Sequence, residues 1–405
     1  MTGIKRTDNM TKESRAEDFI ADAERHNEWW SEGVGRDLAE ATKRTPRSDF
    51  HKVLKAVHEQ DEKGTESLVY PIYGSTGIGK TTLLYQLVAA LISTTEFPPR
   101  DTEFDIVSSV SPRQILYVPL EASLYNLERP GEGIKRLKQV VDYFHTHIAP
   151  RNGRKYILLD DVDILNLDES GKETLLEFVS EDTYLFLTGI VDSQVDLRYE
   201  AGADDVDHIE RPWGVLPMKF VDTIGHPEDE VGLSVNFSTE FREQLESFRS
   251  DRLPGPNPIK DVREGLNLRS SEFDLEPAIE SLNSLYFDSF GPSERDDLHD
   301  AVRDYLRKGG TLHRTADTPV RNEIVRSHFL LYLYKGLAKY GSIQNPENLH
   351  RLSSIAASQA GEELKYTEIS DRIGVDRRTV DSYLDVLDDG IAVTESHDYS
   401  LRRHR

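Results

Sequence analysis

The stretch from Gly74 to Thr81 constrains this chain more than any other part of it. It reads Gly-Ser-Thr-Gly-Ile-Gly-Lys-Thr, which fits the pattern G-x-x-x-x-G-K-[ST] of loops that wrap around a polyphosphate. The pattern is meaningful only between a strand and a helix, and the apolar runs 68–73 and 82–92 predict both elements. A glycine-rich turn with an incidental lysine is the alternative, but such a turn would not need these flanks. The sequence therefore predicts a nucleotide-binding loop.

Each residue type in the loop has a physical role. The glycines let backbone N–H groups point inward around a polyphosphate, and the positive end of the following helix dipole lies behind them. We expect Lys80 to reach the β- and γ-phosphates of ATP, and the Thr81 hydroxyl to bind Mg²⁺. The predicted nucleotide-binding residues are Gly74, Ser75, Thr76, Gly77, Ile78, Gly79, Lys80, Thr81 and Thr82.

A second motif, Lys155 to Asp163, predicts the metal and water site. A buried strand here ends in acidic residues, and the carboxyl ends of parallel strands are where such sheets bind ligands. We expect Asp160 to hold Mg²⁺ through water and Asp161 to orient or deprotonate the attacking water. The alternatives are acids that cap the following turn, or a metal site unrelated to a nucleotide. Two further apolar runs, 114–120 and 184–190, predict buried strands. Thr188 lies near the end of the second run, where it is either a γ-phosphate sensor or an ordinary strand residue.

The composition indicates a folded protein with an acidic surface. Its 405 residues are enough for two or three domains, and 37% are hydrophobic, which is too many for a disordered polyanion. The formal net charge of -24 is spread over the whole length, as in salt-adapted, halophilic proteins. The absence of cysteine excludes disulfides, thiolate zinc sites and cysteine nucleophiles. With no apolar run of signal-peptide or membrane-spanning character, we expect a soluble cytoplasmic protein with no membrane partner.

Strands that alternate with helices predict an α/β fold with a parallel sheet and helices on both faces. We expect a helical extension over 1–47 and the P-loop domain over 48–225. A mainly helical region over 226–345 follows, with a proline-rich loop near 253–258, and a winged helix-turn-helix occupies 346–405.

Local patterns add three expectations about packing. Trp29 and Trp30 are expected to pack against the next domain because tryptophan buries a large area. Ser293 to Asp296 resembles a helix-capping box. The apolar side chains of 320–340, including Phe329, Leu330, Leu331 and Leu333, are expected to be core.

The last segment has the pattern helix, tight turn, helix over 366–373, 374–376 and 377–387, and 391–394 could pair with 399–401 as a wing. The start of the second helix would then enter a major groove of double-stranded DNA. Winged helices also bind proteins, and residues 361–405 hold eleven acidic against seven basic residues, which opposes phosphate binding. The expected base contacts are Arg377, Arg378, Thr379, Ser382 and Tyr383, with Arg402, Arg403 and Arg405 near phosphates.

This order of motifs resembles archaeal and bacterial AAA+-like ATPases that carry a helical and winged-helix C-terminal region. The matching features in the predicted P-loop domain are an aromatic-rich helix before it, residues 79–84 where the loop ends and its helix begins, and the strand 115–121. Further along the chain they are the Thr188-Gly189 turn followed by Arg211, the segment 216–222, and the glycine pair 309–310. The resemblance implies ATP hydrolysis, assembly into a homo-oligomer or with a protein partner, and an arginine finger from a neighbouring subunit. Arg198 and Arg211 are the candidates for that finger, and the alternative for each is a surface ion-pair residue.

The chain departs from this family at two positions. Members usually carry an arginine early in the loop, where this chain has Ser75-Thr76-Gly77, and a glutamate where Asp161 stands. The first departure is closer to replication initiators of the origin-recognition type, which are the rival identity. The second shortens the carboxylate arm by one methylene and favours slow hydrolysis. The open hypotheses are a DNA-acting ATPase, a slow nucleotide switch that binds a protein, and a nucleotide-binding scaffold.

Overall fold

The computed structural model describes residues 20–31, 35–44, 46–92, 110–120, 125, 131–220, 223, 275–310, 318–390 and 392–393. The chain divides into two compact units, one formed by Met1–Leu216 with Glu323–Arg405 and the other by Pro217–Asn322. The proline-rich loop near 253–258, the predicted wing at 391–394 and 399–401 (apart from residues 392–393), and the three arginines beyond residue 401 lie outside the described residues. In the described part, no helix is both long and apolar enough to span a membrane.

The first unit is built on a parallel sheet whose strands follow the order β2-β3-β4-β1-β5, with β6 also paired to β1. The four longer strands lie within two residues of the predicted apolar runs, and each is almost wholly buried, as expected for a sheet covered on both faces. The bounds are β1 Leu68–Tyr73, β2 Ile115–Pro119, β3 Lys155–Asp160, β4 Thr183–Gly189, β5 His208–Ile209 and β6 Trp213–Gly214.

The register of these strands brings their carboxyl ends to one edge of the sheet. Ile72 pairs with Thr188, and Pro119 pairs with Asp160, so the strands end together at one edge of the sheet. The loop after β1 begins at Gly74 at that same edge. The α/β fold class is therefore as predicted, and the register brings the loop, the acids and Thr188 to one place.

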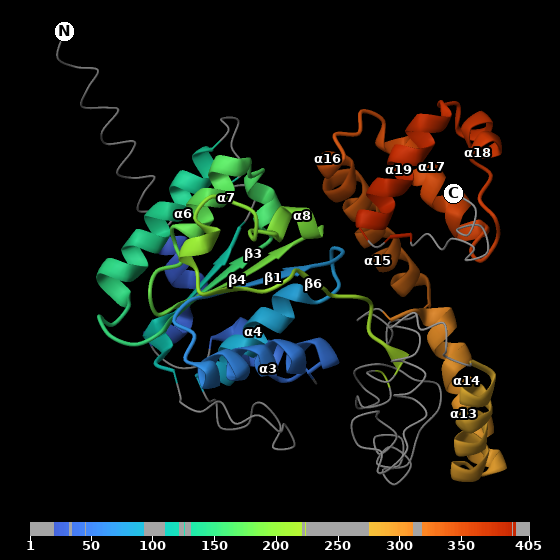
Figure 1. Ribbon diagram of the computed structural model, residues 1–405, viewed down its shortest axis with the longest axis horizontal. Coiled ribbons are helices and arrows are strands. Elements are labelled where there is room, and N and C mark those ends of the chain that lie inside the picture. Colours follow the sequence, from blue (N-terminus) through green and yellow to red (C-terminus); the bar gives the residue numbers. More distant parts are fainter. Residues whose placement is uncertain are drawn as a thin grey trace. The chain divides into compact units, whose positions relative to one another are not determined.

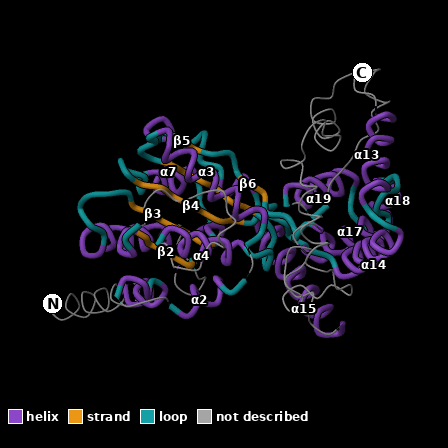
Figure 2. Tube along the Cα trace, turned by 90° about the horizontal axis from the view of Figure 1, so that it is seen from below, coloured by secondary structure: helices purple, strands orange, loops and turns teal. Residues whose placement is uncertain are grey.

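Helices cover both faces of the sheet. Figure 1 shows α6 and α7 on one side and α3 and α4 on the other, and Figure 2 shows the strands running between helices. Helix α4 is buried nearly all round, whereas α6 buries one face with Ile134, Leu137 and Val141. The helix bounds in this part are α2 Arg36–Thr42, α3 Ser48–Lys63, α4 Lys80–Leu91, α6 Glu132–Tyr143, α7 Glu169–Leu176 and α8 Asp192–Val195.

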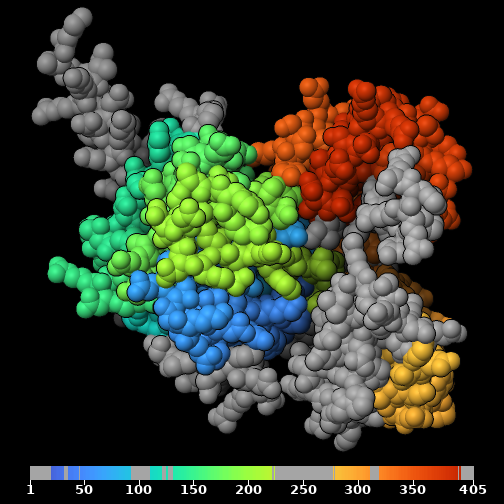
Figure 3. Space-filling model, viewed as in Figure 1, coloured from blue at the N-terminus to red at the C-terminus, as the bar shows by residue number. Residues whose placement is uncertain are grey.

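Short helical turns complete this part of the unit. They are the 3₁₀ turns Glu28–Trp30, Pro112–Gln114, Val162–Leu165 and Ala203–Asp205, and a π turn Phe144–Ile148 that ends α6. Strand β6 is joined to α3 by a hydrogen bond from Trp213 Nε1 to Asp49 Oδ1 (3.1 Å). Figure 3 shows the blue surface of the segment near residue 50 beside the yellow-green surface of the segment near residue 200.

The N-terminal segment closes the open edge of the sheet at β2. The Asn27 amide donates to Tyr117 O and accepts from Tyr117 N, both at 2.7 Å, in the manner of a neighbouring strand. The indole N–H groups of Trp29 and Trp30 both donate to Ile115 O, at 3.3 and 2.7 Å. These bonds satisfy backbone groups that an edge strand leaves free. The prediction that the tryptophans pack is confirmed, and they belong to the core of the sheet.

The C-terminal helices of the same unit form a second core. Helix α18 (Tyr366–Ile373) ends at Gly374, whose φ of 74° makes the tight turn, and α19 (Arg377–Asp389) follows it against α17 (Pro346–Ser358). The shared core contains the predicted residues Ile369, Ile373, Val380, Leu384 and Leu387, with Val375 partly buried. Residues Ile190 and Val191, directly after β4, are buried in this same core.

The predicted long helix before these elements is interrupted. Helix α15 (Thr318–Leu331) runs into a π turn at Tyr332–Leu337, and α16 (Ala338–Tyr340) follows it. The expectation that its apolar residues are all core is partly wrong. Leu333 is fully buried and Leu330 half-buried, but Phe329 and Leu331 are 37% and 42% exposed, because the π turn brings only the later residues inward.

The second unit contains α13 (Leu275–Ser289) and α14 (Pro292–Lys308). Its capping box differs from the prediction: the Glu294 carboxylate accepts from Gly291 N at 2.8 Å, so the cap lies two residues before Ser293. Proline is well suited to the first position of a helix, which explains why the helix begins at Pro292. Tyr305 OH donates to Met218 O at 2.7 Å and ties α14 to the start of the unit.

Candidate nucleotide-binding site

The loop from β1 to α4 has the backbone that a phosphate cradle requires. Gly74, Gly77 and Gly79 all have positive φ, at 155°, 79° and 104°. A Cβ atom on Gly74 would lie 2.5 Å from Val215 O, so the close approach of these two backbones excludes any larger residue. Gly79 is the last residue before α4, which starts at Lys80. The loop thus ends at a helix N-terminus, where anions are stabilised.

The side chains of the loop differ in exposure. Thr76, Gly77 and Thr81 are exposed, and Ser75, Gly79 and Thr82 are half-buried, so a ligand can reach them. Gly74 and Ile78 are buried, and Ile78 anchors the loop in the core. The predicted residues therefore form one continuous loop around the start of α4.

The Lys80 ammonium lies beneath this loop. Its side chain is 5% exposed, and Nζ donates to Gly74 O at 2.9 Å and to Ser75 O at 3.3 Å. Nζ is also 3.9 Å from Asp161 Oδ1. The two carbonyls hold the cation against the first residues of the loop.

Asp160 is held by three hydroxyl groups. Thr81 Oγ1 donates to Oδ2 at 2.5 Å, Tyr117 OH donates to the same oxygen at 3.0 Å, and Thr188 Oγ1 donates to Oδ1 at 2.6 Å. The residue is 4% exposed, so these bonds replace solvent. The donors come from α4, β2 and β4, which are far apart in sequence. The structure therefore brings Thr81 and Asp160 together as the sequence predicts, and adds Tyr117.

Thr188 connects the two acids. Besides donating to Asp160, its hydroxyl oxygen accepts from Asp161 N at 2.8 Å. Thr188 is fully buried, and both roles of its hydroxyl are used within the protein. This geometry makes Thr188 an orienting residue for the acids. A role in sensing the γ-phosphate stays a prediction.

Asp161 stands out in the site by its backbone conformation and by the pKa of its side chain. Its φ of 60° is in the left-handed region, which aspartate tolerates better than most residues. Its side chain is 52% exposed, and neighbouring protein covers the rest. That burial, followed by the charge of Asp160, raises the pKa of Asp161 to about 6, while the Lys80 ammonium acts in the opposite direction.

Asp163 is a third acid of the motif, to which the sequence interpretation gave no role at the nucleotide. Burial raises its pKa, and the charge of Lys80 partly offsets this. Its Oδ1 atom is buried with no hydrogen-bond partner. The acid motif contained this residue, but its spacing alone did not show that it faces the site.

The donor set fits Mg²⁺ held mainly through water and phosphate. Thr81 and Asp160 present oxygen atoms, the ligands that this hard cation prefers. Among the described residues, no group of three or more acidic or histidine side chains is arranged to hold a metal unaided. A Mg²⁺ ion at this edge would therefore complete its shell with water and nucleotide oxygens, as is usual in phosphate sites.

Arg47 is a further residue that the sequence interpretation missed. Its guanidinium donates to Ile78 O at 2.6 Å, to Leu216 O at 2.5 Å and to Asp49 Oδ2 at 2.8 Å. It is 8% exposed at the side chain. The arginine therefore fastens the outer side of the loop to the chain after β6. The sequence interpretation placed this residue at the end of the helical extension over 1–47 and gave it no role.

The predicted DNA-contacting residues lie at the start of α19. Arg377, Arg378 and Ser382 are exposed, whereas Tyr383 packs partly against the second core. Thr379 N donates to the capping carboxylate of Asp376 at 2.9 Å. Hydrogen bonds from Thr379 lower the pKa of Asp376. The helix start thus presents two arginines, while exposed acids occupy its later turns at Asp381, Asp385, Asp388 and Asp389.

The two candidates for an arginine finger have different surroundings. Arg198 forms a fork with Asp196 through Nε (2.9 Å) and Nη2 (2.6 Å), which lowers the pKa of Asp196. Arg211 is exposed on the segment between β5 and β6. Arg198 is therefore held in an ion pair within the chain, and a finger role for either arginine stays a prediction.

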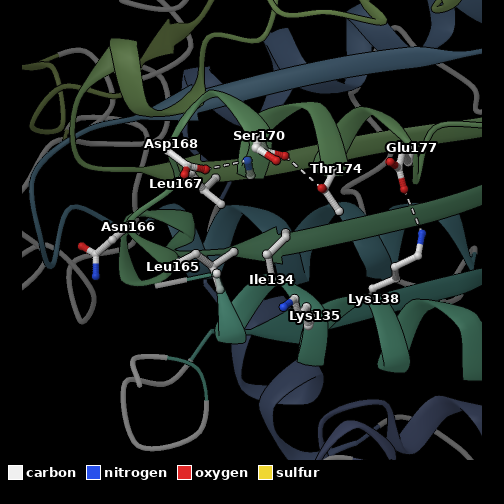
Figure 4. A pocket seen from close by; sticks show the side chains of 12 residues that line it. Ile134, Lys135, Lys138, Leu165, Asn166, Leu167, Asp168, Ser170, Thr174 and Glu177 are labelled. Carbon is white, nitrogen blue, oxygen red and sulfur yellow. Dashed lines mark hydrogen bonds and ion pairs between the residues drawn. The ribbon is translucent and has the colours of Figure 1, made fainter. Parts of the chain in front are cut away.

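A separate hollow of about 310 Å³ lies between α6 and α7. Figure 4 shows Lys138 pointing toward Glu177 across it (2.9 Å), while Asp168 Oδ1 accepts from Gly171 N at the start of α7 (2.8 Å). Its lining includes none of the residues predicted to bind nucleotide. The candidate nucleotide site is thus distinct from this hollow.

The C-terminal part of the chain matches a family model. Residues 300–405 match a family model described as a domain of unknown function (DUF8612). No curated protein matches the sequence. The matched segment begins inside α14 and includes α15 to α19, so it covers the C-terminal helices and not the nucleotide loop.

Several solved structures are similar to the chain at low identity. The Aeropyrum pernix ORC1 protein in complex with DNA has 15% identity and a TM-score of 0.31, with 88% of this chain and 86% of that chain covered. The Aeropyrum pernix ORC2 protein (ADPNP-ADP complexes) has 12% identity and a TM-score of 0.35, covering 84% and 85%. C. elegans PCH-2 has 12% identity and a TM-score of 0.30, covering 67% and 72%. These scores are too low to support an argument about activity.

Proposed function

We propose that the chain is a P-loop ATPase of the AAA+ class that binds Mg²⁺–ATP in the loop from Gly74 to Thr82 and hydrolyses it. The observation that carries the proposal is the meeting of Lys80, Thr81, Asp160 and Asp161 at the carboxyl edge of the sheet. Phosphoryl transfer requires three such parts: a lysine within a glycine loop, a hydroxyl group at a helix N-terminus, and a carboxylate that is hydrogen-bonded to that hydroxyl.

The chemistry follows from positioning and charge. Lys80 moves from the loop carbonyls to the phosphate oxygens and stabilises the charge that develops there. Thr81 and Asp160 would hold Mg²⁺, which when bound supplies further charge neutralisation at the phosphates. Asp161 then orients a water molecule and accepts its proton, a role in which its raised pKa of about 6 makes it a better base than an ordinary aspartate.

Turnover of ATP tests this proposal. The wild type is compared with Lys80→Ala and Asp161→Asn at high salt, which suits the acidic surface. We expect Asp161→Asn to keep ATP binding while losing most turnover, and Lys80→Ala to lose both. Equal rates in the three proteins would contradict catalysis at this loop.

We further propose that nucleotide state is coupled to double-stranded DNA through the helix-turn-helix. The support is that Ile190 and Val191, two and three residues after Thr188, are buried in the core that holds α18 and α19. Arg377 and Arg378 at the start of α19 are the contacts for the groove. Duplex DNA should then stimulate turnover. Preference for one DNA sequence would favour an origin-recognition-like initiator over a general DNA-dependent ATPase.

The second candidate is a slow nucleotide switch whose helix-turn-helix binds a protein. It is favoured by the exposed acids along α19, which repel phosphates, and by the short carboxylate at Asp161. This candidate predicts slow turnover that DNA does not change. A third outcome, tight ATP binding with no turnover under any condition, would identify a nucleotide-binding scaffold.

A further inference from the structure

Tyr117 occupies a position next to the proposed metal site that neither the loop motif nor the acid motif includes. It lies on β2, and its hydroxyl donates to Asp160 Oδ2 at 3.0 Å. The residue is 1% exposed, so its hydroxyl faces the protein interior and not solvent. Phenylalanine would fill nearly the same volume, and the hydroxyl therefore has a use only through this bond and its neighbours.

The Tyr117 bond restricts how Asp160 can turn. Oδ1 is held by Thr188, while Oδ2 accepts from both Thr81 and Tyr117. The Thr81 hydroxyl must keep its hydrogen on Oδ2 if its oxygen is to face a cation. Tyr117 holds that same oxygen from the buried side. A rotation of the carboxylate would break at least one of these bonds, so the phenol keeps Oδ2 directed at Thr81.

The phenol is itself fixed in place. The side-chain amide of Asn27 forms hydrogen bonds of 2.7 Å with both the backbone N and the backbone O of Tyr117. The ring centroid of Tyr117 lies 4.6 Å from that of Tyr85. Burial, followed by the charge of Asp160, raises the pKa of Tyr117 well above its ordinary value. The hydroxyl consequently keeps its proton and remains a donor over the whole working range of pH.

We propose that Tyr117 is a positioning residue that sets the affinity of the site for Mg²⁺ by orienting Asp160. This inference rests on the proposed nucleotide function. Partners of metal-ligating groups typically contribute about 10- to 100-fold in metal affinity. Tyr117→Phe should therefore raise the Mg²⁺ concentration needed for tight ATP binding by about 10-fold or more, while metal-free nucleotide binding is unchanged.

The experiment is a titration of Mg²⁺ against binding of a fluorescent ATP analogue, with a metal-free sample containing EDTA for each protein. The matched control is Tyr156→Phe, which removes a buried phenol hydroxyl from β3. Tyr156 pairs with Ile115 at the start of the strands, whereas Asp160 pairs with Pro119 at their end. Urea unfolding in EDTA measures any general loss of stability in both variants.

The outcomes separate the two proposals. A higher Mg²⁺ midpoint in Tyr117→Phe alone, with equal metal-free binding, supports the inference. Equal Mg²⁺ midpoints in wild type and Tyr117→Phe overturn the inference and leave the proposed function standing. Equal shifts in Tyr117→Phe and Tyr156→Phe would also overturn it, because the effect would then be general. A wild type that binds no nucleotide overturns both proposals.

Discussion

The hydroxyl of Thr188 can be removed with little change in shape by Thr188→Val. Both threonine and valine branch at Cβ, so the fully buried site stays filled. The substitution leaves Asp160 Oδ1 without its 2.6 Å donor and Asp161 N without its 2.8 Å acceptor. We therefore expect the core of the sheet to lose stability, and the two acids to lose their common orientation.

The two lost hydrogen bonds determine how far Thr188→Val should lower the free energy of unfolding. A hydrogen bond to a charged group contributes about 1.5–3 kcal/mol and a neutral one about 0.5–1.5 kcal/mol, so the free energy of unfolding should fall by about 2–4.5 kcal/mol. Thr188→Ser keeps the hydroxyl and loses one methyl group, which costs about 1 kcal/mol. A matched control is Thr183→Val on the same strand. Thr183 is equally buried, but its hydroxyl bonds only to the neutral Ser180 hydroxyl at 3.0 Å.

Urea unfolding followed by tryptophan fluorescence measures these differences. The three tryptophans of the chain, Trp29, Trp30 and Trp213, all pack in the core of the sheet, so the signal reports on that core. Thr188→Val is expected to lower the free energy of unfolding the most. Thr183→Val and Thr188→Ser should each lower it by about 1 kcal/mol. If Thr188→Val costs no more than Thr183→Val, the assignment of Thr188 as the orienting residue is refuted.

Three other predictions concern charge. The pKa of Asp161 is raised to about 6 and its carboxylate form is the active one, so the acidic limb of the rate–pH profile should lie near pH 6, with turnover falling below it. Asp163→Asn should move this limb to lower pH, because it removes a charge that raises the pKa of Asp161. A wild-type limb near pH 4 would contradict this prediction. Arg47→Met should cost about 3–5 kcal/mol in urea unfolding because it leaves the buried Asp49 carboxylate unpaired; a loss below about 1 kcal/mol would contradict a buried ion pair. Arg378→Ala should weaken duplex binding and, because it removes one cation from the groove, lower its salt dependence by about one unit in a log–log plot. An unchanged affinity and slope would exclude Arg378 from the DNA interface.

The main elements of the sheet could be predicted because buried parallel strands are continuous apolar runs. Strands β1 to β4 were each expected within two residues of their observed bounds. Strands β5 and β6 have two residues each, which is too short for any periodic signal. The π turn at Tyr332–Leu337 could not be predicted either, because helical periodicity continues through it in the sequence.

The site could be predicted where its residues are neighbours in sequence. Lys80 and Thr81 follow from the loop motif, and Asp160 from the end of a strand. The partners of Asp160 depend on the register of three strands, so Tyr117 carried no signal: its neighbours on β2 are all apolar, and all but Pro119 are buried. Arg47 was hidden for a similar reason, since its acceptors are backbone carbonyls distant in the chain.

The central claim is that the loop binds Mg²⁺–ATP through Lys80, and calorimetric titration of ATP tests it most directly. Wild type and Lys80→Ala are titrated in the presence of Mg²⁺ at high salt. Removing a cation that contacts the phosphates should cost at least about 1.5–3 kcal/mol, which is roughly a 10- to 150-fold loss of affinity. Saturable one-site binding by the wild type with this loss in Lys80→Ala is the predicted result. Equal affinity in the two proteins, or no binding by the wild type, would contradict the account.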